Sequence, residues 1–132
     1  MNGIVPIVRH LILCEDIRVD PTNPQQVSLV NLVSRIQSTS NPPYPMSYPQ
    51  LCVFVQLTGC RGTGRVAIRI TQPDGTRVSS SAERTVNLGT DPLAVVDLRL
   101  RMRACPFPAA GLYFIQFCYN GVSLAEEPLL AE

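Results

Sequence analysis

Apolar and charged side chains alternate along residues 96–103, VDLRLRMR. The four apolar residues occupy even positions, and Asp97 and three arginines occupy the odd ones. Because successive side chains of a β-strand point to opposite faces of a sheet, this pattern predicts a strand with one buried and one solvated face. Residues 65–71, RVAIRIT, repeat it. Helical periodicity with capping residues is hard to find, so we expect an all-β chain.

Turn signals separate the predicted strands. Asp74-Gly75 and Asn120-Gly121 both accept the positive φ values of a type I′ hairpin, and the glycine-rich residues 59–64 indicate a looser hairpin. Seven to nine antiparallel strands in one domain, residues 1–132, indicate a sandwich or a barrel. The predicted strands are residues 7–19, 27–37, 50–58, 64–72, 76–89 (as one strand or two), 93–104, 111–119 and 122–130.

The stretch FPAAGLYFIQF, residues 107–117, favours the sandwich. Tyr113 follows Gly111 at a predicted strand start, as in the tyrosine corner of immunoglobulin-like domains, where the hydroxyl bonds back to the upstream backbone. The cysteine that usually follows two residues later is replaced by Ile115, which excludes a disulfide-linked immunoglobulin domain. We therefore expect an antiparallel immunoglobulin-like β-sandwich.

Several motifs, taken in order, resemble those of a bacterial family of small, uncharacterised immunoglobulin-like β-sandwich proteins. The motifs are LCEDIRVD, VFVQLTGCRG, PDGT, FPAAGLYFIQF and LAEEPLL. They consist of turns and core positions and extend over nearly the whole chain. The resemblance implies the same fold and a bacterial origin, and it transfers no functional residue.

Composition excludes several kinds of enzyme. The chain has eleven arginines and no lysine, so it offers no Schiff base, no pyridoxal-phosphate anchor and no P-loop lysine. His10 is the only histidine, it has apolar neighbours on its face of the predicted strand, and no GxSxG motif is present. One histidine without a CxxC pair does not supply the usual zinc ligands. We predict a non-enzymatic protein without catalytic, cofactor or metal-binding residues.

The cysteines indicate a reducing compartment. Five cysteines without a close pair do not form a secreted disulfide framework, and the N-terminus lacks the features of a signal peptide. No apolar run is long enough to span a membrane. We predict a cytoplasmic protein with buried thiols. One enzyme hypothesis remains: Cys60 lies in a glycine-rich turn beside Arg61, whose guanidinium would lower the thiol pKa and create a reactive cysteine.

Two predicted strands, 50–58 and 111–119, are apolar on both faces, although a two-layer sandwich has a single interior. Either a long loop of the same chain or another subunit must therefore cover the second face. If these strands are neighbours, as immunoglobulin-like topology places them, their outward side chains merge into one apolar patch that marks an interaction surface. We predict that the protein forms homo-oligomers through this second apolar face. Its residues are Cys52, Phe54, Leu112, Phe114 and Cys118.

Residues 40–50, SNPPYPMSYPQ, combine four prolines with two tyrosines. The PxxP spacing of Pro42 and Pro45 allows a polyproline II ligand, but the PPxY motif is not met and the segment runs into a core strand. We interpret it as a structural lid or an interface arm whose Tyr44 and Tyr48 lie on exposed apolar sheet.

Arg99, Arg101 and Arg103 form a row on one face of their predicted strand, about 6.6–6.8 Å apart. The simplest interpretation is a solvated face that discourages aggregation. The alternative function is binding of an anionic ligand or nucleic acid along this row. The net charge of +1 and the lack of an exposed aromatic ladder disfavour nucleic acid.

Overall fold

The computed structural model describes residues 5–132, which form ten strands. Within this range the chain forms no helix that is long and apolar enough to cross a membrane. Each predicted strand segment contains a strand, but the total of ten exceeds the predicted seven to nine, because 27–37 is divided into β2 and β3 and 76–89 into β6 and β7. In addition, β4 begins at Met46 instead of residue 50, and β8 covers Val96–Phe107 instead of residues 93–104. The strands are β1 (Ile7–Val19), β2 (Val27–Leu32), β3 (Arg35–Ile36), β4 (Met46–Thr58), β5 (Thr63–Thr71), β6 (Arg77–Ser80), β7 (Arg84–Asn87), β8 (Val96–Phe107), β9 (Gly111–Tyr119) and β10 (Val122–Ala131).

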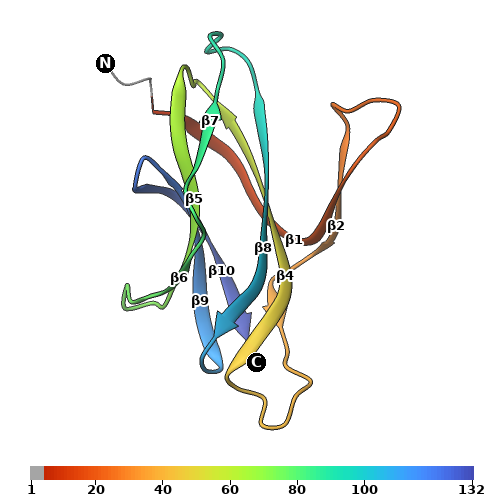
Figure 1. Cartoon of the computed structure of the whole chain (residues 1–132), viewed down its shortest axis with the longest axis vertical. Coiled ribbons are helices and arrows are strands. Elements are labelled where there is room, and N and C mark those ends of the chain that lie inside the picture. Colours follow the sequence, from red (N-terminus) through yellow and green to blue (C-terminus); the bar gives the residue numbers. More distant parts are fainter. Residues whose placement is uncertain (1–4) are drawn as a thin grey trace.

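The strands form two open sheets that face each other (Figure 1). Sheet A has the order β2-β1-β4-β8, and sheet B has the order β3-β10-β9-β5-β6, with β7 also paired to β5. All pairs are antiparallel except the short parallel pair of β3 and β10. The predicted antiparallel two-sheet architecture is confirmed, and because neither sheet closes on itself the chain is not a barrel.

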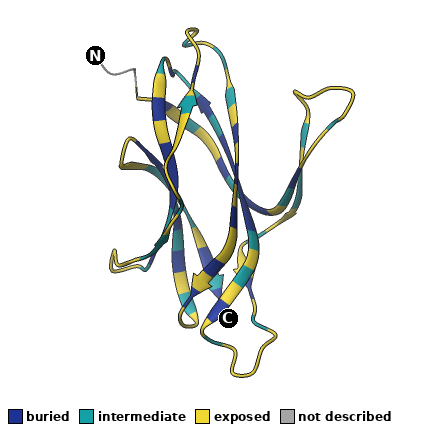
Figure 2. Cartoon of the chain, viewed as in Figure 1, coloured by how far each residue is buried: buried dark blue, intermediate teal, exposed yellow. Residues whose placement is uncertain are grey.

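Alternating side chains of both sheets fill the space between them, which we call the main core. Buried and exposed residues alternate along the ribbons in Figure 2, as the sequence predicts. The inward residues of β8 at positions 98, 100 and 102 are buried, whereas the three arginines between them and beyond are exposed. The largest fully buried side chains include Leu51, Val53, Val55, Leu57, Tyr113, Ile115 and Phe117.

The predicted tyrosine tie is present before β9. The hydroxyl of Tyr113 donates a hydrogen bond to the carbonyl oxygen of Ala109 over 2.7 Å, and it accepts one from the Ala109 N–H over 3.3 Å. The Tyr113 ring packs edge-on against Phe107, with ring centroids 5.0 Å apart. This tie fixes the crossing from β8 to β9.

One of the two predicted type I′ turns is confirmed and the other is wrong. Asn120 and Gly121 have φ values of 49° and 83°, as a type I′ turn requires. At the β5–β6 connection only Gly75 has a positive φ, 90°, and the Gly75 N–H donates to the Gln72 carbonyl over 2.9 Å. Pro73 explains the difference, because its ring fixes a negative φ that suits the first position of a type I turn.

The expected pairing of residues 50–58 with residues 111–119 is wrong. These segments are β4 and β9, and they lie in different sheets. Both sides of β4 are occupied by β1 and β8, and both sides of β9 are occupied by β5 and β10. The outward apolar side chains therefore form two separate surfaces, one on the outer face of each sheet.

Candidate interaction surfaces

The outer face of sheet A carries a small second core. Cross-strand pairing places Cys14 opposite Cys52 and Ile12 opposite Phe54. Cys14, Ile17, Cys52 and Phe54 form a buried cluster. Val27 and Leu29 of β2 pack against it, so the β1–β2 hairpin, which extends from the body of the molecule in Figure 1, covers it at its base.

Arg101 fastens this hairpin to the sheet. Its Nη2 donates to Asp16 Oδ1 over 3.1 Å and to the Ile17 carbonyl oxygen over 3.0 Å. Since Arg101 pairs with Cys52 across β4 and β8, its side chain crosses the outer face of β4 to reach β1. Cys52 is fully buried and Phe54 is 6% exposed. A segment of the same chain thus covers both residues, and their predicted place in an interface between two copies is wrong.

The outer face of sheet B retains exposed apolar surface. Leu112 is 41% exposed and Phe114 is half-buried, whereas Cys118 is only 1% exposed. Pairing with β10 places Leu130 beside Leu112 and Pro128 beside Phe114. We call Leu112, Phe114, Pro128 and Leu130 the apolar strip. The sequence analysis missed its β10 half.

Opposite charges flank the next row of this face. Arg69 of β5 and Glu126 of β10 both pair with Gln116 of β9, so the three residues form one row across the sheet. The guanidinium of Arg69 donates to the Gly121 carbonyl oxygen over 3.2 Å. The apolar strip is therefore bordered by a cation on its β5 side and by a carboxylate on its β10 side.

The proline- and tyrosine-rich loop packs on its own domain. The Tyr44 hydroxyl donates to the Glu132 carbonyl oxygen over 2.6 Å. Tyr44 and Tyr48 are half-buried and contact the main core. Tyr44 lies in the loop before β4 and Tyr48 lies in β4 itself, so both side chains belong to the packing of this domain.

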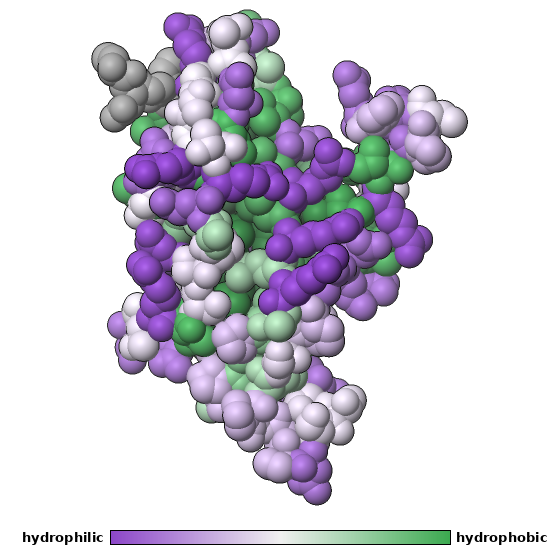
Figure 3. Space-filling model, viewed as in Figure 1, coloured by the Kyte–Doolittle hydropathy of each residue, from purple (hydrophilic) through white to green (hydrophobic). Residues whose placement is uncertain are grey.

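The arginine row lies along the last strand of sheet A. Arg99 and Arg103 are exposed, and Arg101 is held by Asp16. In Figure 3 a band of long hydrophilic side chains crosses this side of the molecule, over the apolar interior. The structure thus brings the three predicted residues together on one face.

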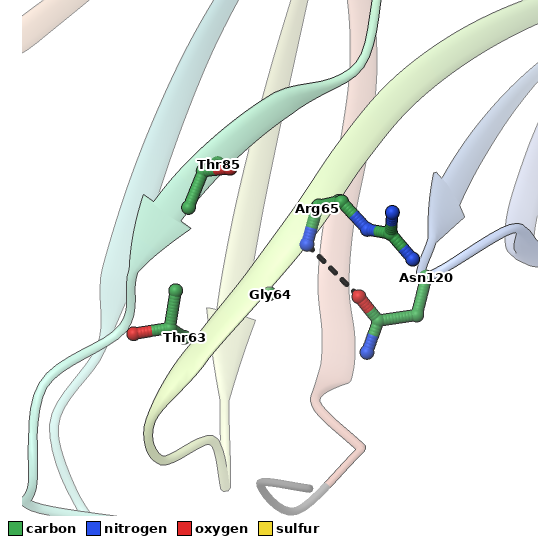
Figure 4. A pocket seen from close by; sticks show the side chains of 5 residues that line it. All are labelled: Thr63, Gly64, Arg65, Thr85 and Asn120. Atoms are coloured by element: carbon green, nitrogen blue, oxygen red, sulfur yellow. Dashed lines mark hydrogen bonds between the residues drawn. The ribbon is translucent and has the colours of Figure 1, made fainter.

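A further surface feature is a shallow hollow near the paired strands β5 and β7. Its volume is about 520 Å³, and it is lined by Thr63, Gly64, Arg65, Thr85 and Asn120 (Figure 4). Asn120 Oδ1 accepts a hydrogen bond from the Arg65 backbone N–H over 2.9 Å, which ties the β9–β10 turn to β5. Residues 5–132 contain no group of three His, Cys, Asp or Glu side chains placed to hold a metal ion.

A comparison with known protein families matches residues 9–132 to a family of unknown function, DUF6941. The chain belongs to this family. No curated protein matches it. The match confirms the resemblance to an uncharacterised family, and it includes every residue of the surfaces described above.

The thiols of this DUF6941 chain are buried. Cys60 has no exposed surface, and burial raises the pKa of its thiol instead of the lowering expected from Arg61. Burial also raises the pKa of Cys14 and of Cys105 to about 11, with Cys52 and Asp16 adding to the effect at Cys14. The predicted activation of Cys60 is therefore wrong.

We expect all five thiols of the native protein to react slowly with iodoacetamide at pH 8. Burial keeps the reagent away from all five thiols. Only the thiolate is nucleophilic, and at Cys14 and Cys105 a pKa of about 11 leaves about one part in a thousand ionised at that pH. Mass spectrometry after a timed pulse measures the labelling, and the same protein in urea, where all five should react within minutes, is the control. Rapid modification of Cys60 alone in the native state would restore the reactive-cysteine hypothesis.

Proposed function

We propose that the protein is a non-enzymatic binding and assembly module that self-associates through the apolar strip on sheet B. The observation that carries this proposal is the exposed side chain of Leu112, which lies beside half-buried Leu130 on the outer face of sheet B. Contiguous apolar patches on soluble proteins commonly mark interaction sites.

The flanking charges favour a second copy of this chain as the partner. A two-fold axis parallel to β9, placed between two such faces, exchanges the β5 side of one copy with the β10 side of the other. Arg69 of each copy then faces Glu126 of the other, while the two apolar strips pack together. The face is therefore self-complementary, as a two-fold interface requires.

The assignment to the immunoglobulin-like class belongs to the same proposal. It is supported by the hydrogen bond from Tyr113 to Ala109 at the entry to β9 and by the two open antiparallel sheets. The five unpaired, buried thiols support a reducing compartment such as the cytoplasm.

Leu112→Glu should convert the oligomer to a monomer without unfolding it. A carboxylate at the centre of a dry contact is strongly unfavourable, whereas the same side chain is solvated in the monomer. Size-exclusion chromatography with light scattering gives the mass, and circular dichroism reports the fold. Leu93→Glu is the matched control, because Leu93 is 87% exposed in a loop and its substitution should leave the mass unchanged. A monomeric wild-type protein, or a Leu112→Glu variant of unchanged mass, would refute the proposal.

Charge reversal tests the two-fold arrangement. Arg69→Glu and Glu126→Arg should each weaken association, because each places like charges in contact across the interface. The double variant restores opposite charges and should recover most of the wild-type association. Failure of the double variant to recover would exclude this orientation of the two copies.

A further inference from the structure

The β8 edge of sheet A is unpaired. β4 is its one strand partner within residues 5–132, and β8 is 12 residues long. Alternate backbone N–H and C=O groups of such a strand point away from the sheet and can template pairing with another chain. At Ala104 φ is 52°, a left-handed conformation that ends the regular part of this edge, so the edge available for pairing runs from about residue 96 to residue 103.

A groove follows this edge. Two hollows of about 240 and 210 Å³ share Ser81, Arg101 and Met102 and thus form one depression, which we call the edge groove. One wall is β8, and the other is formed by residues 79–82 and by β5 and β7. Figure 1 shows β8 beside β7 and β6 of the opposite sheet, with the seam of the sandwich between them. The floor includes buried Val66 and Ile68, so the groove gives access to the edge of the main core.

The edge groove is cationic. Arg84, Arg101 and Arg103 line it, and no acidic residue is among its lining residues. Arg99 extends the same row on β8. Among the described residues, Arg84, Arg99 and Arg103 form no ion pair within 4.0 Å. Their charges are therefore available to a ligand.

We propose that the β8 edge binds an extended acidic segment of a partner protein as an added strand of sheet A. A strand paired to β8 alternates between the two faces of the sheet. Its residues on the outer face meet the arginine row, and its residues on the inner face meet Leu100, Met102 and the floor of the edge groove. The ligand is thus a segment in which acidic and apolar residues alternate over five to seven positions.

A second copy of this chain does not fit the edge. Antiparallel pairing of two β8 strands about a two-fold axis at Arg101 would place Arg101 opposite Arg101 and Arg99 opposite Arg103, and a shift of the axis by one residue still places Arg99 opposite Arg101. Like charges on neighbouring strands destabilise a sheet. Asp97, which accepts a hydrogen bond from Gln56 Nε2 over 3.1 Å, lies at the start of the row and disfavours acidic residues there. The acidic ligand residues therefore lie opposite residues 99–103.

This proposal is independent of self-association through the apolar strip. The edge groove and the arginine row belong to the β8 border, whereas the strip lies on the outer face of β9 and β10. A Leu112→Glu monomer should retain the peptide affinity of the wild type, so the two proposals can fail separately.

Binding of a fluorescein-labelled peptide with three glutamates alternating with three valines tests the proposal. Fluorescence anisotropy gives the affinity, and amide chemical shifts in two-dimensional nuclear magnetic resonance locate the site. We expect saturable binding with the largest shifts at residues 98–103. A peptide of the same composition with the glutamates in one block and the valines in another should bind about tenfold more weakly, because its charges do not follow the strand period. An alternating peptide with every second amide N-methylated should not bind, because the methylated amides cannot donate backbone hydrogen bonds to β8.

The double variant Arg99→Glu/Arg103→Glu should lower the affinity for the alternating peptide by about tenfold or more, because two attractive contacts become repulsive. Neither residue is buried or paired, so the fold should be retained. Arg9→Glu/Arg61→Glu makes the same change in net charge at exposed sites away from the groove, and it should have little effect. The proposal would be overturned if the alternating peptide did not bind, or if the methylated peptide bound equally well. It would also be overturned if both double variants weakened binding equally, or if a single-stranded oligonucleotide bound more tightly at the same residues.

Discussion

Phe54→Glu should unfold the protein. Phe54 is 6% exposed in the cluster that the β1–β2 hairpin covers, so the substitution removes a buried aromatic ring and places a carboxylate in an apolar cluster, where only Arg99 on the paired strand β8 lies opposite it. Loss of the ring alone costs about 3–5 kcal/mol, and the desolvation of a carboxylate in this cluster adds to that cost even beside Arg99. The sum is comparable to the whole stability of a typical domain, about 5–15 kcal/mol. We expect loss of the β-type circular dichroism spectrum, or a urea midpoint lowered to a small fraction of the wild-type value.

Leu32→Glu is the matched control for this substitution. Leu32 lies on β2 of the same hairpin, opposite Cys14, but it is 71% exposed. Its replacement should change the free energy of unfolding by no more than about 0.5 kcal/mol. A Phe54→Glu variant with an unchanged urea midpoint would mean that the hairpin does not cover the outer face of sheet A in solution.

Gly64→Ala should destabilise the protein by about 2–3 kcal/mol. The backbone of Gly64 lies directly against the ring and hydroxyl of Tyr119, and an added Cβ would overlap that ring. The ring cannot move aside easily, because Tyr119 is 3% exposed and packed in the main core. Thr63→Ala, at the exposed neighbouring position, is the control and should have little effect. Urea unfolding followed by circular dichroism measures both variants.

A double-mutant cycle identifies the cause of this effect. If the clash with Tyr119 is responsible, Gly64→Ala should cost much less in a Tyr119→Leu background, because the shorter side chain leaves space for the new methyl group. Equal costs in both backgrounds would show that the effect arises from the backbone of β5 instead. The Tyr119 hydroxyl finds no hydrogen-bond partner among the described residues, so little is lost with it.

The strands could be predicted from the sequence because their signal is local. Alternation in residues 96–103 and the Asn120-Gly121 turn depend on residues that are adjacent in the chain. The division of strands between sheets depends on contacts that are distant in sequence, and this is where the prediction failed. Immunoglobulin-like analogy placed β4 beside β9, whereas the actual partners of β4 are β1 and β8.

The candidate surfaces, too, depend on contacts between residues that are distant in the sequence. Two apolar faces on β4 correctly indicated that something covers Cys52 and Phe54, but periodicity does not say what. The cover depends on Arg101 reaching Asp16, a contact between residues 85 positions apart. On sheet B, Leu112 was predicted, whereas its neighbour Leu130 was missed. An irregularity in register between Ser123 and Ala125 shifts the alternation of β10, so its outward positions do not follow from the sequence alone.

Arg101 belongs to two surfaces at once. The residue lies on the wall of the edge groove, and its guanidinium reaches across β4 to fasten the β1–β2 hairpin. An acidic ligand at β8 would compete with Asp16 for it, and by thermodynamic linkage a ligand that draws Arg101 away must also weaken the closure of the hairpin over Phe54. Conversely, conditions that loosen the hairpin would free Arg101 and raise the affinity of the edge for an acidic strand. The hairpin and the edge would then act as one reciprocal switch, with a single side chain as its shared component.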